Sequence, residues 1–328
     1  TQLIKRHPAS RRVRQQAGIA RRRDVPLEDH AALPDGSDRP DPIGILTEQD
    51  QQRLQNLVPI RHGRMSATPF TFYRGGAAVM ASDLSRLPTT DLGVQLCGDA
   101  HLSNFGVFNG PDRRMVFDLN DFDETHPGPF EWDVKRLAAS VVVAGRNNEL
   151  STKKIDRAVR SAVKGYRDVV ARVAQSGPLD VHYWRLELDR IRDQFDVAGE
   201  LGDKARNRFD KMTKKAGRKN SLRAQSKLTD IVDGRRVIVP DPPLITRVDE
   251  LLEPGESSVL GGFFERYLES LPYYRRVLLD RYAIVDLAHK VVGVGSVGTR
   301  CLIVLLESGD GEPLFLQFKE ATASVLEP

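Results

Sequence analysis

Residues 97–106 read CGDAHLSNFG, and residues 116–124, one hairpin later, read VFDLNDFDE. In both stretches polar side chains follow directly on a predicted apolar strand, so that a loop presents them at the edge of a sheet. Asp99 precedes Asn104 by five positions, and Asp118 lies on the second predicted strand. A carboxylate base, an amide oxygen and a second carboxylate are the parts of a magnesium-dependent phosphotransfer site. We therefore expect Asp99 to be the catalytic base and Asn104 and Asp118 to hold magnesium.

The same acids have a simpler interpretation, because Asp and Asn commonly cap turns. Four carboxylates lie within residues 118–124, however, and clustered carboxylates repel one another unless a cation lies between them. His101 is in the same loop, where it either orients the loop by hydrogen bonding or binds a metal. Cys97 is its only nearby companion of fitting type, so zinc is disfavoured and a structural histidine is expected.

A glycine-rich stretch follows much later, with glycines at 293, 295 and 298. The spacing matches a dinucleotide-binding fingerprint, but that fold needs a helix after the third glycine, whereas residues 301–306 are aliphatic and predict a strand. Thr299 and Arg300 exclude a Walker loop. A strand, a glycine turn and a second strand are typical of the phosphate-covering loop of kinases. We expect Gly293, Gly295 and Gly298 to bind the phosphates of ATP.

Lys319 lies one hairpin after this turn, as the phosphate-binding lysine of a kinase lies on the third strand. The alternative is a surface lysine on an edge strand. Arg74 precedes two glycines and the start of a predicted helix, where an arginine binds either a phosphate or one of the many acids of the chain.

Composition limits the class of protein. The chain has 328 residues, of which 40% are hydrophobic and 29% charged, so a wholly disordered chain is excluded. The best apolar run, residues 137–144, is far shorter than the ~20 residues of a membrane span, and no apolar stretch follows the basic start as in a secretory signal. The two cysteines, Cys97 and Cys301, exclude a disulfide scaffold. We expect a cytoplasmic protein that does not enter a membrane.

The formal charge of +4 is an average over unlike parts. Residues 1–23 carry eight basic and no acidic residues, and residues 204–227 carry ten basic residues and one acidic residue. The rest of the chain therefore has a surplus of acids. The two basic segments are interpreted either as a contact with phosphates or nucleic acid, or as a flexible arm and a solvated helix.

The sequence divides into three parts. Residues 1–45 predict a basic, weakly ordered arm, and residues 46–282 predict a mainly helical region that contains the Asp99 loop. Residues 283–328 predict the start of a small antiparallel β lobe, and the chain is expected to be a piece of a longer protein. Within the middle region we expect helices at 48–57, 131–147, 151–176, 183–195 and 263–271, strands at 93–97, 105–108 and 114–119, and a hairpin at 229–239.

Three motifs, CGDAHLSNFG, VFDLNDFDET and PFEWDVKRLAAS, resemble the bacterial Domain of Unknown Function 2252 family. The resemblance runs from about Arg61 to the end of the chain. That family has no assigned chemistry, so the resemblance implies no substrate.

The loop at 97–106 is also similar to the HGD-x-H-x-x-N loop of aminoglycoside phosphotransferases and related small-molecule kinases. This resemblance implies that Asp99 is the base, that Asn104 and Asp118 bind the metal, and that Asp121 is the acid often found three positions later. Cys97 departs from the pattern, since it replaces the first histidine. Asp133 matches an aspartate that braces the catalytic loop, but the stretch before it is three residues longer here, which leaves Asp118 and Asp121 as alternatives for the main metal ligand.

In kinases the glycine loop and the lysine precede the catalytic loop, whereas here they follow it by nearly two hundred residues. The resemblance therefore implies an α+β, kinase-like fold in circularly permuted order, with the helical lobe first and the nucleotide lobe last. Glu320 and Glu327 are the candidates for the acidic partner of Lys319. The implied function is ATP- and magnesium-dependent phosphoryl transfer to an unidentified small-molecule or protein acceptor. The alternatives are nucleotidyl transfer to a protein by the same fold, and a non-catalytic nucleotide-sensing or nucleic-acid-binding scaffold.

Overall fold

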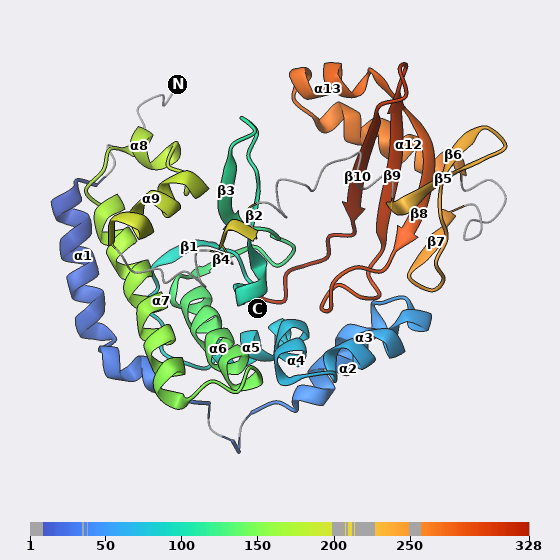
Figure 1. The fold of residues 1–328 in the computed structure, drawn as a ribbon. Helices are drawn as coiled ribbons and strands as arrows, with labels where there is room; N and C mark the ends of the chain where they lie inside the picture. Colours follow the sequence, from blue (N-terminus) through green and yellow to red (C-terminus); the bar gives the residue numbers. More distant parts are fainter. Residues whose placement is uncertain are drawn as a thin grey trace, which may run out of the picture.

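The structure is a computed structural model, and it describes residues 9–34, 36, 37, 39–198, 207, 209–211, 213, 227–248 and 257–327. It is a mixed α and β fold with small antiparallel sheets. Figure 1 shows a four-stranded sheet on one side, the long helices α6 and α7 on the other, and helices α2 to α5 along the base, with the C-terminus between the two sides. The basic segment 204–227 lies almost wholly outside the described residues.

The N-terminal residues are more helical than their composition predicts. Ser10 caps α1 (Arg11–Asp24), a helix with no buried residue, where we expected a weakly ordered arm. The helix predicted at 48–57 was placed wrongly, since the helix of this region is α2 (Pro42–Gln51). It begins earlier because Asp41 caps it, with its carboxylate accepting from the amides of Ile43 and Gly44. Three short helices follow, which are α3 (Val58–Met65), α4 (Pro69–Gly75) and α5 (Ala77–Leu84).

Two hairpin-like pairs carry the polar loops. The predicted strands are confirmed as β1 (Gly93–Leu96), β2 (Phe105–Asn109) and β3 (Met115–Leu119). Strand β2 pairs with β3, and β1 pairs with β4 (His126–Pro129), which the sequence did not predict. The two pairings place the loop after β1 beside the residues that follow β3.

The long helices were predicted closely, since α6 covers Glu131–Asn147 and α7 covers Thr152–Val173. The helix predicted at 183–195 is confirmed in its second half, as part of α9 (Leu188–Ala198), but its start is wrong. Residues 178–182 form a separate short helix, α8 (Pro178–His182), and an extended stretch lies between α8 and α9. That stretch is held against β3, because the amide of Phe117 donates to the carbonyl of Leu186 at 2.9 Å.

The C-terminal sheet has the order β10-β9-β8-β7 and is antiparallel throughout. Its strands are β7 (Ile245–Arg247), β8 (Tyr282–Lys290), β9 (Cys301–Ser308) and β10 (Pro313–Lys319). The sheet therefore begins with β7, ahead of the boundary expected at residue 283. Two helices, α12 (Ser257–Ser270) and α13 (Tyr273–Leu279), come between β7 and β8.

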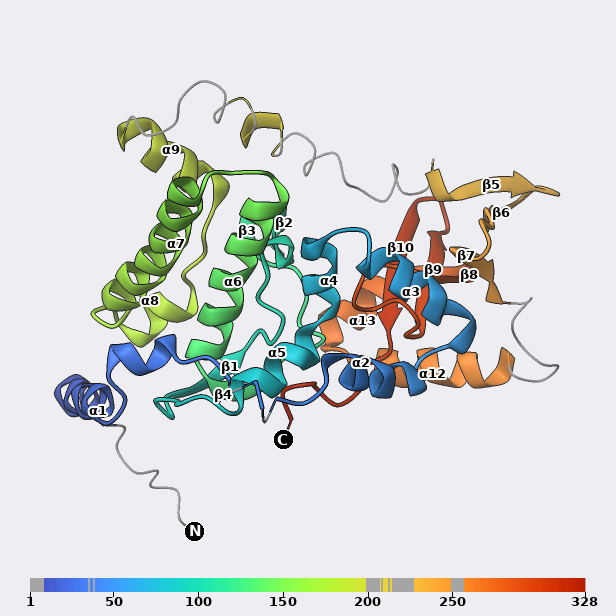
Figure 2. The ribbon, with the colours of Figure 1, turned by 90° about the horizontal axis from the view of Figure 1, so that it is seen from below.

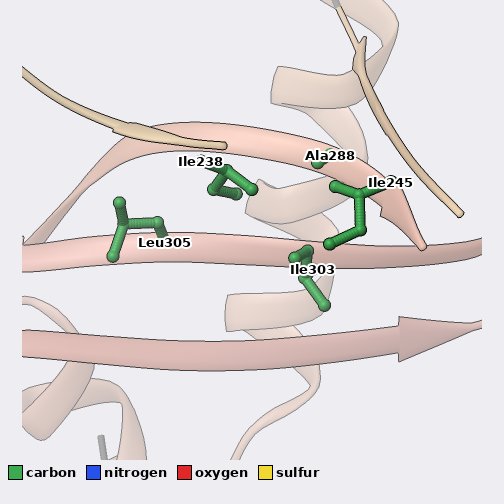
Figure 3. Close-up of a cluster of buried hydrophobic side chains, with 5 residues drawn as sticks. All are labelled: Ile238, Ile245, Ala288, Ile303 and Leu305. Atoms are coloured by element: carbon green, nitrogen blue, oxygen red, sulfur yellow. The ribbon is translucent and has the colours of Figure 1, made fainter. Parts of the chain in front are cut away.

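The predicted hairpin at 229–239 is confirmed as β5 (Thr229–Val232) and β6 (Arg235–Ile238). Its turn residues Asp233 and Gly234 both have positive φ, as a two-residue hairpin turn requires. Ile238 from this hairpin packs into the core of the sheet. Figure 3 shows that core, which consists of Ile238, Ile245, Ala288, Ile303 and Leu305.

The glycine turn, residues 291–300, joins β8 to β9 and packs against the N-terminal helices. Figures 1 and 2 both show α2 and α3 beside the end of the sheet. Val294 packs with Leu46 and Met65, and Val297, which is fully buried, packs with Leu57. The turn is thus fixed to helices that precede the Asp99 loop. No helix in the described part of the chain is both long and apolar enough to cross a membrane.

The core in Figure 3 yields a stability prediction. Leu305 is 0% exposed, so Leu305→Ala removes buried methyl groups and leaves a cavity. We expect a loss of about 2–5 kcal/mol in the free energy of unfolding, measured by urea denaturation. Ile231→Ala is the control, since Ile231 is 53% exposed and its truncation should cost less than about 1 kcal/mol. Equal losses for the two variants would contradict this description of the core.

Candidate functional site

A cavity of about 1100 Å³ lies where the N-terminal helices, the Asp99 loop, the acidic stretch after β3 and the glycine turn meet. These segments lie far apart in sequence, from Ile45 in α2 to Thr299 in the glycine turn. The cavity brings together most of the predicted site residues, namely Arg74, Asp99, His101, Asn104, Asp121, Gly293 and Gly295. Four others, Asp118, Asp133, Gly298 and Lys319, do not line it.

The Asp99 loop is braced from behind by α6. The carboxylate of Asp133 accepts from the backbone amides of Cys97 and Gly98, at 2.7 and 3.1 Å. Asp133 thus fixes the backbone of the loop at two positions. Burial raises the pKa of Asp133, while the two amide hydrogen bonds favour its charged form.

Gly98 is required by the path of the loop. Its φ is +84°, and a Cβ at this position would lie 1.9 Å from the carbonyl oxygen of Glu124. No side chain fits there, so the loop passes directly against the backbone of the acidic stretch. This contact sets the distance between Asp99 and the carboxylates that follow β3.

Arg136 holds Asp99, and sequence reasoning missed it. The Arg136 guanidinium donates to Oδ1 of Asp99, from Nε at 2.7 Å and also from Nη2, and the residue is only 2% exposed. It stacks over the ring of Tyr73 at 4.6 Å. A signal was present in the sequence, because positions 133, 136 and 140 fall on one face of the predicted helix, and Ser140 also contacts the loop through the amide of Leu102.

His101 lies on the other side of Asp99. Its Nε2 is 3.5 Å from Oδ2 of Asp99, and its Nδ1 is buried without a hydrogen-bond partner among the described residues. Burial lowers the pKa of His101, and the charges of Arg136 and Arg74 lower it further, although Asp99 acts in the opposite direction. The imidazole is therefore neutral near pH 7 and does not neutralise Asp99.

Asn104 is buried and ties the loop to the acidic stretch. Its Nδ2 donates to the backbone carbonyls of Asp99 and Asp121, both at 3.1 Å. With the amide nitrogen committed to these bonds, Oδ1 is the atom of Asn104 that suits a cation.

Lys319, at the end of β10, contacts the acidic stretch directly. Its Nζ lies 2.6 Å from Oδ2 of Asp121 and 3.1 Å from Oδ2 of Asp123. Burial alone would lower the pKa of Lys319, but the two carboxylates outweigh it and raise it. Burial and the neighbouring Asp121 carboxylate raise the pKa of Asp123, whereas the hydrogen bonds to Lys319 and Asp123 overcome burial and lower that of Asp121.

Asp118 lies apart from this group. It is exposed within β3, opposite Gly106, and its Oδ1 accepts from the backbone amide of Leu119 at 2.8 Å. The sequence left Asp118 and Asp121 as alternatives for the main metal ligand. Of these two, Asp121 lines the cavity and contacts Lys319, and Asp118 does neither. Glu320 and Glu327 were the candidates for the acidic partner of Lys319, and both have other contacts. Glu320 pairs with Arg300 at 2.9 Å, and Glu327 lies 4.0 Å from His126.

The backbone of the glycine turn is held by arginines from the N-terminal helices. Arg64 donates to the carbonyl of Gly293 at 2.8 Å, and Arg53 donates to that of Val297 at 2.7 Å. The carbonyl of Gly298 accepts from the amide of Leu54 at 2.8 Å. Gly293 and Gly298 both have positive φ, so glycine is favoured at these two positions.

The donors at the cavity suit a hard cation. Asp121, Asp123 and Asn104 offer oxygen ligands of the kind that Mg²⁺ prefers. Within the described ranges, no three His, Cys, Asp or Glu side chains are arranged to hold a metal by themselves. A cation bound by these oxygens would take the rest of its coordination from a bound phosphate or from water.

Comparison with known proteins identifies the family. The sequence profile described as "Uncharacterized protein conserved in bacteria (DUF2252)" matches residues 53–328, and the chain belongs to this family. The searches of curated proteins and of solved structures each gave no match.

The brace behind the loop is tested by Asp133→Ala. This change leaves the amides of Cys97 and Gly98 without an acceptor and should cost about 1–3 kcal/mol for each group left unpaired. Asp133→Asn keeps one oxygen acceptor and should cost less. Urea denaturation measures both, with Asp156→Ala on the exposed face of α7 as the control. An unchanged unfolding free energy in Asp133→Ala would contradict the bracing role.

The buried His101 predicts a pH dependence of stability. Because its pKa is lowered in the folded state, the unfolded chain binds a proton first as the pH falls through about 6.5. The stabilisation is therefore complete above that pH and decreases below it, with a slope of at most about 1.4 kcal/mol per pH unit. In His101→Asn the slope between pH 7.5 and 5.5 should be shallower, whereas the exposed His182→Asn should match the unaltered protein. Equal slopes in all three would argue against burial of the imidazole.

Proposed function

We propose that this protein is an ATP- and magnesium-dependent phosphotransferase that transfers a phosphoryl group to a hydroxyl acceptor. One observation carries the proposal, which is the contact of Lys319 with Asp121 beside a cavity that also contains Asp99 and the glycine turn. A lysine, a carboxylate that suits a metal, a carboxylate base and a glycine turn are the groups that phosphoryl transfer from ATP requires. Here they come from four separate segments of the chain.

We assign the role of general base to Asp99. Its Oδ1 is taken by Arg136, so Oδ2 is the oxygen that accepts the proton of the acceptor hydroxyl. The oxygen of the acceptor then forms a bond to the γ-phosphorus as the bond between that phosphorus and the β–γ bridging oxygen breaks. The products are the phosphorylated acceptor and ADP. A general base of this kind contributes about 10²–10⁴ to the rate.

The nucleotide phosphates are assigned to the glycine turn and Lys319. Gly293 and Gly295 line the cavity, where the absence of side chains lets a phosphate approach the backbone. Lys319 is held by Asp121 and Asp123 at a position from which its ammonium group can turn to a phosphate. The volume of about 1100 Å³ is enough for a nucleotide together with a small acceptor.

Magnesium is assigned to Asp121, Asp123 and Oδ1 of Asn104. When bound, the ion neutralises charge on the phosphates. The chain itself supplies the rest of the electrostatic arrangement. Lys319 keeps Asp121 charged, and Asn104 fixes the backbone carbonyls of Asp99 and Asp121 relative to one another.

We further propose that the fold is kinase-like and circularly permuted. The glycine turn and Lys319 follow the Asp99 loop in sequence, yet they meet it in space, as the two halves of a kinase do. The antiparallel strand, glycine turn, strand and lysine-bearing strand occur in the order that a kinase nucleotide lobe uses.

Binding of ATP with Mg²⁺, measured by titration calorimetry, tests the proposal. Lys319→Met and Asp121→Asn should each weaken binding by about tenfold or more, because each removes a charged contact to the phosphates or to the metal. Asp118→Asn is the matched control, since Asp118 is a carboxylate three residues away that lies outside the cavity, and its binding should be unchanged.

Two outcomes would contradict the proposal. One is the absence of magnesium-dependent ATP binding by the unaltered protein. The other is loss of binding in Asp118→Asn with retention in Asp121→Asn. Turnover against a library of metabolites and proteins then separates phosphoryl from nucleotidyl transfer, since only the second attaches the adenylate to the acceptor.

A further inference from the structure

Arg74 is a cation of the cavity that pairs with no acid in the described part of the chain. It lies near the end of α4 and lines the cavity. Its Nε is buried and makes no hydrogen bond with any described residue, and the described contacts assign it no salt bridge. Arg53 also lines the cavity and has a buried Nε without a partner, but its Nη1 donates to the carbonyl of Val297.

Most of the carboxylates that line the cavity with Arg74 have other donors. Asp99 is bound by Arg136, Asp121 and Asp123 are bound by Lys319, and Glu320 is bound by Arg300. Glu124 accepts from the backbone amide of Val325 at 2.8 Å. Arg74 is therefore a cation in an acidic cavity that pairs with none of these acids. A guanidinium in such a place is suited to an anion that the protein itself does not provide.

The position of Arg74 is defined from two sides. A Cβ on Gly295 would lie 3.1 Å from the backbone oxygen of Arg74, so the residue abuts the glycine turn. Its positive charge also acts on His101, next to Asp99. Arg74 thus lies between the turn assigned to the nucleotide phosphates and the loop assigned to the base.

The first turn of α5 lines the cavity together with Arg74. Helix α5 begins at Ala77, and within the described chain no side chain caps it. Ala77 and Ala78 line the cavity. The amides of a first helical turn favour an anion, so they act together with the Arg74 guanidinium.

We propose that Arg74 binds the terminal phosphoryl group of the nucleotide, the group that is transferred. This rests on the proposed function and names a contact that function did not assign. The planar guanidinium of arginine can donate hydrogen bonds to two oxygens of a phosphate. Its permanent positive charge stabilises the negative charge on the equatorial oxygens of the phosphoryl group during transfer. An anionic acceptor is the competing occupant, and the test separates the two.

The test compares Mg·ATP with Mg·ADP, which differ by the group in question. In the unaltered protein ATP should bind more tightly than ADP. Arg74→Met, which keeps an unbranched apolar stem and removes the charged guanidinium, should weaken ATP binding by about tenfold and change ADP binding by less than about twofold. Arg74→Lys should fall between, because it keeps the charge and loses the fork. Arg146→Met, an exposed arginine at the end of α6, is the control and should match the unaltered protein.

The outcomes are distinct. Equal weakening of ATP and ADP in Arg74→Met, or weakening of neither, overturns the inference and leaves the proposed function standing. Absence of binding of both nucleotides to the unaltered protein overturns the proposed function, and the inference with it. Arg74→Lys provides the same comparison if Arg74→Met does not fold, as judged by its thermal unfolding.

Discussion

The burial of Val294 and Val297 against the N-terminal helices is the constraint on which the arrangement of the molecule depends. These valines belong to the turn between β8 and β9, so their burial fixes one end of the C-terminal sheet beside α2 and α3. A buried valine contributes about 1.5–3 kcal/mol, whereas a half-exposed ion pair such as Lys319 with Asp121 contributes less. The hydrophobic contact therefore positions the sheet. The ion pair between Lys319 and Asp121 follows from this position of the sheet, and it joins the end of β10 to the acidic stretch.

The cavity that results has an uneven distribution of charge. Its walls carry more carboxylates than cations, and most of the acids near Asp99 are held by a specific donor from another segment. In the proposed function, a nucleotide enters this cavity together with a divalent cation whose charge offsets the carboxylates, and its phosphates face Arg74 and the glycine turn. Asp99 has a charge partner of its own, because the Arg136 guanidinium that binds it is buried in the helical half.

The sequence predicted those parts of the fold that local pattern determines. The limits of α6, the strands β1 to β3 and the hairpin at Asp233-Gly234 follow from periodicity and turn chemistry, and the family resemblance is confirmed. The pairing of β1 with β4 and the extended stretch after α8 depend on distant partners, which a local pattern does not reveal. The choice between Asp118 and Asp121 depends on where β3 ends. Asp118 lies inside the strand, where the pairing with β2 fixes its backbone. Asp121 lies beyond the strand, where the backbone can turn and bring its carboxylate to Lys319. Arg136 was missed because helical periodicity was used to find apolar faces only.

The central claim is that the Asp99 loop and the glycine turn form a single nucleotide site. A crystal structure of the protein with Mg²⁺ and a non-hydrolysable ATP analogue tests it most directly. We expect the phosphates of the analogue between Gly295 and Asp99, the metal on Asp121, and the Nζ of Lys319 moved from Asp121 to a phosphate oxygen. An analogue bound outside this cavity, or a cavity without it at saturating concentration, would contradict the account.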